Sequence, residues 1–307
     1  MSIKIFGHQN PDTDTVTSAL VLEHIEKARG NDDVEAVMLG EIGEETAFAL
    51  NYFGVDAPKI IDSVIDGERV MLVDHNEFQQ SAKNIENAEI LKVYDHHRIS
   101  NFETESPLYF RAEPVGCTAT ILYKVFKEEG LDIPKDMAGL MLSAVISDTL
   151  LFKSPTTTKE DEETGRALAD LAGVDVDTYG LEMLKAGAST KDKTAAELIG
   201  QDAKTFAINE KNVRIAQINV VDVDEVFERR QELETAINAE VDREEYDLFI
   251  LVVTNILVSD SKVLALGKDH KAVEAAFDVT LDDNTAILEG VVSRKKQVVP
   301  NITKALS

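Results

Sequence analysis

The sequence predicts an α/β protein of two domains. Through the first two-thirds, short apolar runs typical of buried strands alternate with longer segments of helical periodicity, and this alternation predicts a mostly parallel sheet with helices on both faces. A chain of 307 residues also exceeds the roughly 100–200 residues of one domain. A small, polar segment without periodicity then precedes a second set of strands and helices. We therefore expect a domain over 1–187, a linker over 188–194 and a smaller α/β domain over 195–307.

The elements of the first domain follow from apolar periodicity and from end signals. Gly30 and Gly54 can cap the ends of the first two helices, because glycine readily adopts the left-handed conformation at a helix C-terminus. The helices are expected over 16–29, 44–53, 114–129 and 137–151. The strands are expected over 3–6, 34–39, 70–73 and 90–94.

The second domain repeats the strand and helix pattern on a smaller scale. Its strands are expected over 213–220 and 248–253, and an apolar run over 286–292 leads into Ser293-Arg294-Lys295-Lys296. One charged amphipathic helix is expected over 225–241.

Composition excludes several classes of protein. The chain carries 31 Lys and Arg against 57 Asp and Glu, a net charge of −26, and so negative a field repels nucleic acids and anionic membranes. No apolar stretch reaches the ~20 residues of a membrane span, and the N-terminus lacks the pattern of a signal peptide. Cys117 is the only cysteine, so no disulfide can form within the chain. These features indicate a cytoplasmic protein.

Acidic and histidine side chains follow three of the expected strands. These segments are Gly7-His8-Gln9-Asn10-Pro11-Asp12-Thr13-Asp14, Asp74-His75-Asn76 and Asp95-His96-His97. In open α/β sheets, ligands bind in the crevice outside the carboxyl ends of the strands. One histidine near a strand end is more often structural, but three such segments favour a site where carboxylates and imidazoles bind metal ions and transfer protons.

Four aspartates are candidate metal ligands. Asp12 and Asp14 lie two residues apart, and in an extended backbone their side chains point in different directions. They could therefore reach two metal ions about 3.5–4 Å apart, which Asp74 could bridge from a neighbouring strand end. Asp148 lies in or at the end of an apolar helix, where an unpaired carboxylate is costly, so metal ligation is favoured over a capping role.

The kinds of ligand narrow the choice of metal. Carboxylates combined with imidazoles suit Mn²⁺ or Co²⁺ better than Mg²⁺ or Ca²⁺. No cysteine joins the cluster, which argues against a structural zinc site. Cys117 is expected to be a buried helix residue.

These motifs resemble those of the family II inorganic pyrophosphatases, within the DHH phosphoesterase superfamily. Asp-His-His alone is shared across the superfamily, but the first motif together with the terminal Ser-Arg-Lys-Lys is much more specific. The other matches are Val73-Asp74-His75-Asn76, Pro114-Val115-Gly116-Cys117-Thr118 and Ser147-Asp148. The resemblance covers nearly the whole chain, departs at no motif position, and implies a DHH domain followed by a DHHA2-type domain.

The resemblance implies two Mn²⁺ (or Co²⁺) ions per chain, with one aspartate shared between them. The implied ligands of the first ion are His8, Asp12 and Asp74. The implied ligands of the second are Asp14, Asp74, His96 and Asp148.

The resemblance also implies the residues that act on the substrate. His97 contacts the substrate and protonates the leaving phosphate, and Asp95 orients a histidine. The implied phosphate-binding residues are Lys204, Arg294 and Lys295. Sequence alone would make Lys204 a surface lysine, and Lys296 is an alternative to Lys295.

The implied activity is that of an inorganic diphosphatase, which hydrolyses pyrophosphate to two phosphates by a two-metal-activated hydroxide. The family is cytoplasmic and homodimeric through the N-terminal domain, its active site lies between domains that open and close, and Mg²⁺ accompanies the substrate. A charge count agrees, since four ligand aspartates balance two divalent ions. The negative charges of the hydroxide and of pyrophosphate are then left over, and cationic side chains are needed to balance them.

Three alternative functions stay open at this point. Another DHH phosphoesterase, acting on oligonucleotides or cyclic dinucleotides, usually carries a Gly-Gly-Gly-His-type motif that is absent here. A short-chain exopolyphosphatase would use the same site chemistry. A metal-dependent binding protein without turnover would not need a leaving-group acid.

Overall fold

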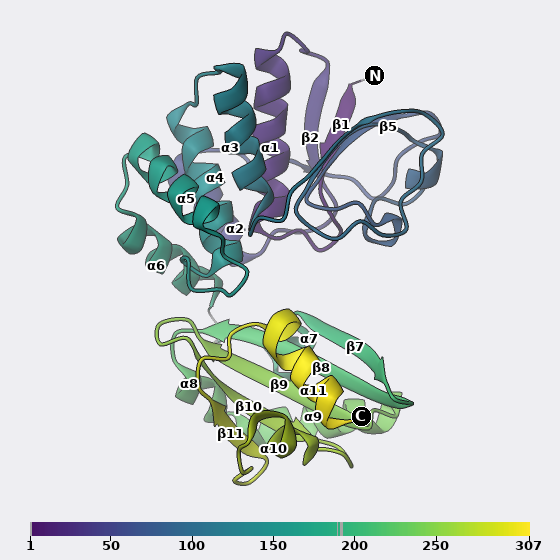
Figure 1. Cartoon of the computed structure of the whole chain (residues 1–307), viewed down its shortest axis with the longest axis vertical. Helices are drawn as coiled ribbons and strands as arrows, with labels where there is room; N and C mark the ends of the chain where they lie inside the picture. The colour runs from purple at the N-terminus through teal and green to yellow at the C-terminus, as the bar shows by residue number, and fades with distance from the viewer. Residues whose placement is uncertain (1, 189, 191–192) are drawn as a thin grey trace. The chain divides into compact units, whose positions relative to one another are not determined.

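The computed structural model describes residues 2–188, 190 and 193–307. The chain divides into two compact units, an N-terminal unit over Met1–Gly187 and a C-terminal unit over Ala188–Ser307 (Figure 1). The predicted linker over 188–194 includes positions 189, 191 and 192, which lie outside the described residues.

The N-terminal unit is built on a six-stranded sheet in the order β3-β2-β1-β4-β5-β6, in which all pairs are parallel. The strands are β1 (Ile3–Phe6), β2 (Val34–Met38), β3 (Lys59–Ile60), β4 (Arg69–Val73), β5 (Glu89–Asp95) and β6 (Tyr109–Ala112). The sequence predicted the four inner strands. It missed β3 and β6, because these short edge strands are largely exposed and lack a continuous apolar run.

Long helices cover one face of this sheet, and the helices predicted on the other face are only short 3-10 turns. The helices are α1 (Thr13–Ala28), α2 (Glu44–Phe53), α3 (Thr118–Glu129), α4 (Lys135–Thr149), α5 (Lys159–Ala172) and α6 (Val176–Gly187). Figure 1 shows α1, α3 and α4 gathered on one side of the strands, where α1 packs on β1 and β2 and α3 on β5. On the other face, Phe78 and Ile85 from the 3-10 turns η1 (Phe78–Gln80) and η2 (Ile85–Asn87) pack against Leu72 and Val93.

Helix α1 begins at Thr13, three residues earlier than predicted. Asp12 is its N-cap, because Asp12 Oδ1 accepts a hydrogen bond from the backbone N–H of Thr15 at 2.9 Å. The expectation that Asp12 and Asp14 share an extended segment is therefore wrong, since Asp14 lies in the first helical turn. Apolar periodicity missed this turn because its buried residues are polar.

The C-terminal unit is a five-stranded mixed sheet in the order β11-β10-β9-β8-β7. Its strands are β7 (Ala203–Ile208), β8 (Lys211–Val220), β9 (Leu248–Asn255), β10 (Asp260–Leu266) and β11 (Thr285–Leu288). Strands β8 and β9 are parallel and the other pairs are antiparallel. One face packs against α7 (Ala195–Gly200), α8 (Val223–Phe227) and α9 (Arg230–Glu244), and the other against α10 (Ala272–Phe277) and α11 (Val299–Ala305).

One prediction for this unit is wrong in detail. The single helix expected over 225–241 is divided into α8 and α9, because Arg229 leaves the helical conformation at φ −96° and ψ 18°. Its guanidinium donates to the carbonyl oxygen of Lys193 at 2.7 Å, which helps to hold the break. The apolar run over 286–292 forms a strand only to Leu288, and the residues that follow form a loop.

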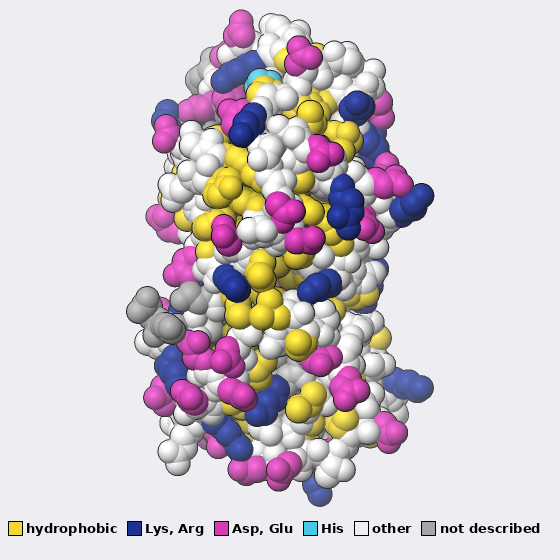
Figure 2. Space-filling model, turned by 90° about the vertical axis from the view of Figure 1, so that its left-hand side faces the viewer, with side chains coloured by type: hydrophobic (Ala, Val, Ile, Leu, Met, Phe, Trp, Pro, Cys, Tyr) yellow, Lys and Arg dark blue, Asp and Glu magenta, His cyan; other side chains and the backbone are white. Residues whose placement is uncertain are grey.

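Charged side chains are mixed on the surface. Figure 2 shows acidic and basic side chains interspersed over the viewed face, with no single acidic patch on it. Within the described part of the chain, no helix has the length and apolar character needed to cross a bilayer.

Candidate metal centre

The carboxyl ends of three adjacent strands position the site. Strands β1, β4 and β5 are neighbours and parallel, so the residues that follow them lie at one edge of the sheet. His8, Asp74 and His96 come from these three strand ends. The sequence predicted this meeting of segments because such crevices are where open α/β sheets bind ligands.

One group of ligand atoms surrounds His8. Its Nε2 lies 3.4 Å from Asp12 Oδ2 and 3.5 Å from Asp74 Oδ2. The three side chains present atoms close enough to share one metal ion, and they are the three predicted for the first ion.

A second group lies on the other side of Asp74. His96 Nε2 is 3.3 Å from Asp74 Oδ1 and 3.8 Å from Asp148 Oδ2. Asp14 and Asp148 face each other beside the thiol of Cys117, with one ligand atom from each residue within 4.8 Å of the others. Asp74 thus directs one oxygen to each group, which is the arrangement that a shared ligand requires.

Asp74 is held by its backbone and by two hydroxyl groups. Its φ is +59°, a left-handed conformation that Asp and Asn adopt more readily than most other residues. Thr15 donates to Asp74 Oδ2 at 2.8 Å, and Thr118 donates to Oδ1 at 3.1 Å. Sequence reasoning missed both threonines, although the polar run after Pro11 and the motif ending in Thr118 were signals.

The N-terminus of α3 holds Asp14. Its carboxylate accepts hydrogen bonds from the backbone N–H groups of Thr118 at 2.7 Å and Ala119 at 3.2 Å, and from the hydroxyl of Ser18 at 2.7 Å. The first N–H groups of a helix have no partner within the helix and favour negative charge. The motif containing Thr118 therefore fixes a candidate metal ligand.

The protonation of the site indicates a need for positive charge. Burial and the charge of Asp74 raise the pKa of Asp14 to about 7. Burial and the charges of the other aspartates raise the pKa of Asp148 well above its usual range. Among the described residues, the ion-pair partners of Asp12, Asp74 and Asp148 are all histidines. Aspartates that repel one another in this way would be stabilised by a divalent cation. Together with the imidazoles, they form a set of ligands that suits Mn²⁺ or Co²⁺.

Metal binding is expected to release protons. Burial lowers the pKa of His8, but Asp12 and Asp74 outweigh it and raise that pKa to about 11. Burial also lowers the pKa of His96, but Asp74, with a smaller contribution from Asp14, outweighs it and raises that pKa to about 9. Both imidazoles therefore carry a proton at pH 7.5 in the metal-free protein and must lose it to ligate a metal. We expect at least two protons released per chain, with a further contribution from Asp14 and Asp148, whose raised pKa values favour their protonated forms, and an Mn²⁺ affinity that rises with pH.

Calorimetric titration of the metal-free protein with Mn²⁺, in two buffers of different ionisation enthalpy, measures this release. A heat of binding that does not depend on the buffer would contradict the expectation.

A buried carboxylate orients His97, whose ring nitrogen also lies within reach of the candidate ligands Asp74 and His96. Asp95 Oδ1 lies 3.0 Å from His97 Nδ1 and also accepts from the backbone N–H of His97. Asn76 donates to Asp95 Oδ2 at 2.6 Å. Burial raises the pKa of Asp95, but hydrogen bonds from His97 and Asn76 outweigh it and lower that pKa. Asp95 thus places a proton on Nδ1 of His97 and leaves Nε2 available.

The neighbouring histidine has a different partner. His96 Nδ1 lies 3.1 Å from the carbonyl oxygen of Val115, so its Nε2 faces the carboxylates. The sequence predicted that Asp95 orients a histidine, and in the structure its partner is His97 rather than His96. His97 Nδ1 also lies 3.7 Å from Asp74 Oδ1, farther than from Asp95.

The remaining predicted residues lie in the C-terminal unit. Arg294 begins the short turn η3 (Arg294–Val298), and its guanidinium pairs with Asp202, Nη2 lying 2.7 Å from Oδ1. Asp202 precedes β7, which carries Lys204, so the structure brings Arg294 and Lys204 to one end of that strand. Lys204 and Lys295 are both exposed.

Glutamine side chains fix the loop that carries Arg294. Gln217 in β8 accepts from the backbone N–H of Arg294 at 2.9 Å and donates to the carbonyl oxygen of Val292 at 2.8 Å. Gln297 accepts from the N–H groups of Val292 and Ser293, each at 2.9 Å. Sequence reasoning missed Gln217, whose signal is a polar residue within an apolar strand.

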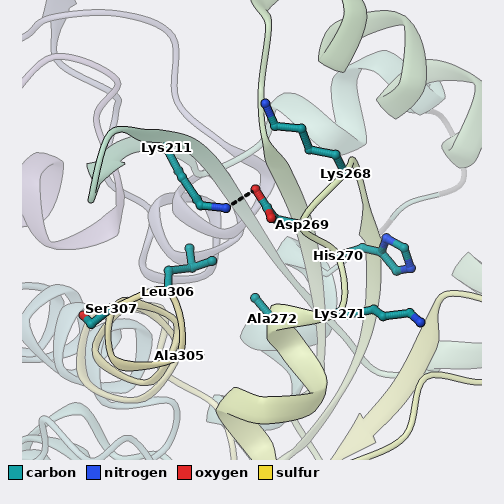
Figure 3. Close-up of a pocket in the computed structure, with 9 residues that line it drawn as sticks. All are labelled: Lys211, Lys268, Asp269, His270, Lys271, Ala272, Ala305, Leu306 and Ser307. Atoms are coloured by element: carbon teal, nitrogen blue, oxygen red, sulfur yellow. Dashed lines mark ion pairs between the residues drawn. The ribbon is translucent and has the colours of Figure 1, made fainter.

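A pocket of about 530 Å³ also lies in the C-terminal unit, and neither Lys204 nor Arg294 lines it. Two of its lysines already have partners, since Lys211 pairs with Asp269 at 2.6 Å and Lys268 pairs with Asp247. Figure 3 shows Lys268 and Lys271 pointing in different directions rather than toward one point. No predicted site residue lines this pocket.

Comparisons with known proteins agree with this architecture. Residues 2–145 match the family described as DHH family, N-terminal domain, and residues 181–305 match the DHHA2 domain. A relative from Staphylococcus epidermidis is 58% identical over 99% of this chain and 98% of its own, and one from Staphylococcus carnosus is 57% identical over 100% and 99%. Both are named probable manganese-dependent inorganic pyrophosphatases.

A solved structure extends the comparison to the fold. The chain from Methanococcus jannaschii, assigned as a family II inorganic pyrophosphatase, is 37% identical with a TM-score of 0.80, and the match covers 99% of each chain. The sequence and the fold of this chain therefore both match those of its relatives over nearly the full length. The chain therefore belongs to the family II inorganic pyrophosphatases, with a DHH domain followed by a DHHA2 domain.

Proposed function

We propose that this protein is a manganese-dependent inorganic pyrophosphatase that hydrolyses pyrophosphate to two phosphates. The observation that carries the proposal is Asp74, whose two carboxylate oxygens face His8 on one side and His96 on the other. The names of the relatives at 57–58% identity support the same activity.

Two metal ions per chain, Mn²⁺ or Co²⁺, fit the two groups of ligands. His8, Asp12 and Asp74 would hold the first, and the second would be held by Asp14, Asp74, His96 and Asp148. When bound, such a pair neutralises the aspartates and lowers the pKa of water toward ~7, which supplies a nucleophile at neutral pH. Additional Mg²⁺ would accompany pyrophosphate and reduce its charge.

His97 supplies the proton for the leaving phosphate in this proposal. Asp95 holds Nδ1 with its proton, so Nε2 of the protonated imidazole can donate to the departing oxygen. General acid catalysis of this kind contributes about 10²–10⁴-fold to a rate. The 41% exposure of the His97 side chain supports contact with a substrate.

Lys204, Arg294 and Lys295 bind the phosphate oxygens in this proposal. The guanidinium can bind phosphate in bidentate fashion, whereas each lysine acts as a point charge. Gln217 fixes the backbone of Arg294 and Asp202 fixes its side chain, so this cation needs little further ordering when it binds.

We further propose that the enzyme is a cytoplasmic homodimer, joined through the N-terminal unit, that does not bind nucleic acid. The net charge of −26 and the single cysteine support these assignments. The edge strands β3 and β6 each have one neighbour, and open sheet edges favour pairing with another chain. A monomeric mass in analytical ultracentrifugation would contradict the dimer.

Phosphate release from three substrates tests the activity. Metal-stripped protein is supplied with Mn²⁺, Co²⁺ or Mg²⁺ and then with pyrophosphate, tripolyphosphate or a dinucleotide. We expect fast release from pyrophosphate alone, strongest with Mn²⁺ or Co²⁺. Preference for tripolyphosphate would instead indicate an exopolyphosphatase, preference for the dinucleotide another DHH phosphoesterase, and no release a binding protein.

A further inference from the structure

Asp161 is a wholly buried carboxylate outside the predicted site. It is the third residue of α5, and it forms a capping box with Thr158, whose backbone N–H and hydroxyl both donate to Asp161 Oδ2 at 2.7 Å. A buried charge is costly unless it is paired or hydrogen-bonded. The capping of α5 explains why Thr158 donates two hydrogen bonds to Asp161. Two further groups also donate to this carboxylate, and capping does not explain them.

The other donors come from a segment that lies 45 residues earlier in the chain. The backbone N–H of Gly116 donates to Asp161 Oδ2 at 2.8 Å, and the hydroxyl of Thr120 donates to Oδ1 at 2.7 Å. Asp161 therefore joins the start of α5 to the loop over 114–118 and to the first turn of α3.

That loop contacts three candidate metal ligands on either side of Gly116. Before it, the carbonyl oxygen of Val115 lies 3.1 Å from Nδ1 of His96. After it, Thr118 donates its N–H to Asp14 at 2.7 Å and its hydroxyl to Asp74 at 3.1 Å. The position of the Gly116 peptide thus affects the orientation of an imidazole and of two carboxylates.

The loop and Asp161 are packed without free space. A Cβ atom at Gly116 would lie 2.7 Å from Asp161 Oδ2 and 3.2 Å from the methyl group of Thr149, which follows Asp148. Glycine is therefore needed at this point for the backbone to reach the carboxylate.

We propose that Asp161 is a positioning residue of the metal centre. By binding the N–H of Gly116, it fixes the loop over 114–118, and the loop in turn holds Nδ1 of His96 and the carboxylate of Asp14. The inference rests on the proposed metal ligands. Partners that orient metal ligands typically change metal affinity by 10–100-fold when they are replaced.

Three variants separate this role from simple helix capping. Asp161→Ala removes the bond to Gly116 and the carboxylate half of the capping box, and leaves the backbone N–H of residue 161 free to donate to Thr158. Thr158→Ala weakens the same cap but leaves the bond to Gly116. Asp161→Asn keeps one acceptor oxygen for Gly116 while its amide group faces Thr120, whose hydroxyl can accept.

Titration of each metal-free variant with Mn²⁺, followed by the electron paramagnetic resonance signal of the free ion, measures the affinity without catalysis. We expect Asp161→Ala to weaken Mn²⁺ binding by at least about tenfold, and Thr158→Ala and Asp161→Asn to stay within about threefold of the wild type. Thr158→Ala should lower the thermal midpoint without this loss of affinity.

Two outcomes would overturn the proposal. One is an Asp161→Ala affinity within about threefold of the wild type, and the other is equal weakening in Asp161→Ala and Thr158→Ala, which would assign the effect to the cap of α5. If Asp161→Ala does not fold, Asp161→Glu replaces it, because glutamate retains a capping box but displaces the carboxylate from Gly116. We then expect Asp161→Glu to weaken Mn²⁺ binding by at least about tenfold, and a change within about threefold would overturn the proposal. A wild type that binds no Mn²⁺ would instead contradict the metal centre itself.

Discussion

Asp74→Asn is expected to lower kcat/KM for pyrophosphate by at least about 10³-fold, because metal ions contribute several kcal/mol to such reactions and each ~1.4 kcal/mol is tenfold in rate. Asp74 faces both His8 and His96, so its loss should affect both ions. Asparagine is the appropriate replacement, since it tolerates the φ of +59° at this position. The bound Mn²⁺, measured by elemental analysis after dialysis, should fall from two to at most one per chain.

The matched control is Asp62→Asn, which also removes one carboxylate charge. Asp62 is exposed and pairs with the exposed Lys83 at 2.6 Å, and such surface pairs contribute little to stability. This variant should keep both ions and full activity. An Asp74→Asn protein that is folded, binds two Mn²⁺ and turns over normally would show that Asp74 is not shared between metals.

His97→Gln is expected to lower kcat by about 10²–10⁴-fold, the range of general acid catalysis, while two Mn²⁺ ions stay bound per chain. The reason is that Asp95 holds Nδ1 of His97 at 3.0 Å, so this imidazole acts as an oriented acid. Glutamine retains polarity but cannot supply a proton from a charged form. Steady-state kinetics and metal analysis on the same preparation separate the two effects.

His96→Gln is the matched comparison, because the two histidines are adjacent and differ in their partners. His96 Nε2 faces Asp74 and Asp148, so its replacement should weaken Mn²⁺ binding. Loss of both metals in His97→Gln would identify His97 as a ligand and contradict its assignment as the acid.

The sequence predicted those parts of the fold that are apolar and continuous. The inner strands and the helix at Glu44–Phe53 were found because their burial produces clear periodicity. The edge strand at Lys59–Ile60 was not, because both residues are exposed. The start of α1 was also missed, since its first buried residues, Thr13, Asp14 and Thr15, are polar. Buried polar turns at a functional site are invisible to a method that follows apolar side chains.

The candidate ligands were predictable because several chemically unusual residues follow strand ends. Their supporting contacts were not, because these contacts join segments far apart in the chain. Thr118 reaches Asp14 across 104 positions, and Asp161 reaches Gly116 across 45. Asp161 alone in the sequence is one acid in a charged helix of ordinary composition. Only the fold distinguishes it from its exposed neighbours Glu160 and Glu163.

We propose that the cluster around Asp74 makes pyrophosphate hydrolysis depend on two metal ions. The most direct measurement is phosphate release from pyrophosphate by metal-stripped protein as Mn²⁺ is added in measured equivalents per chain. We expect negligible release without metal, a rise as Mn²⁺ is added, and a plateau once two equivalents are bound. Full activity without metal, or saturation at one equivalent, would contradict the proposal.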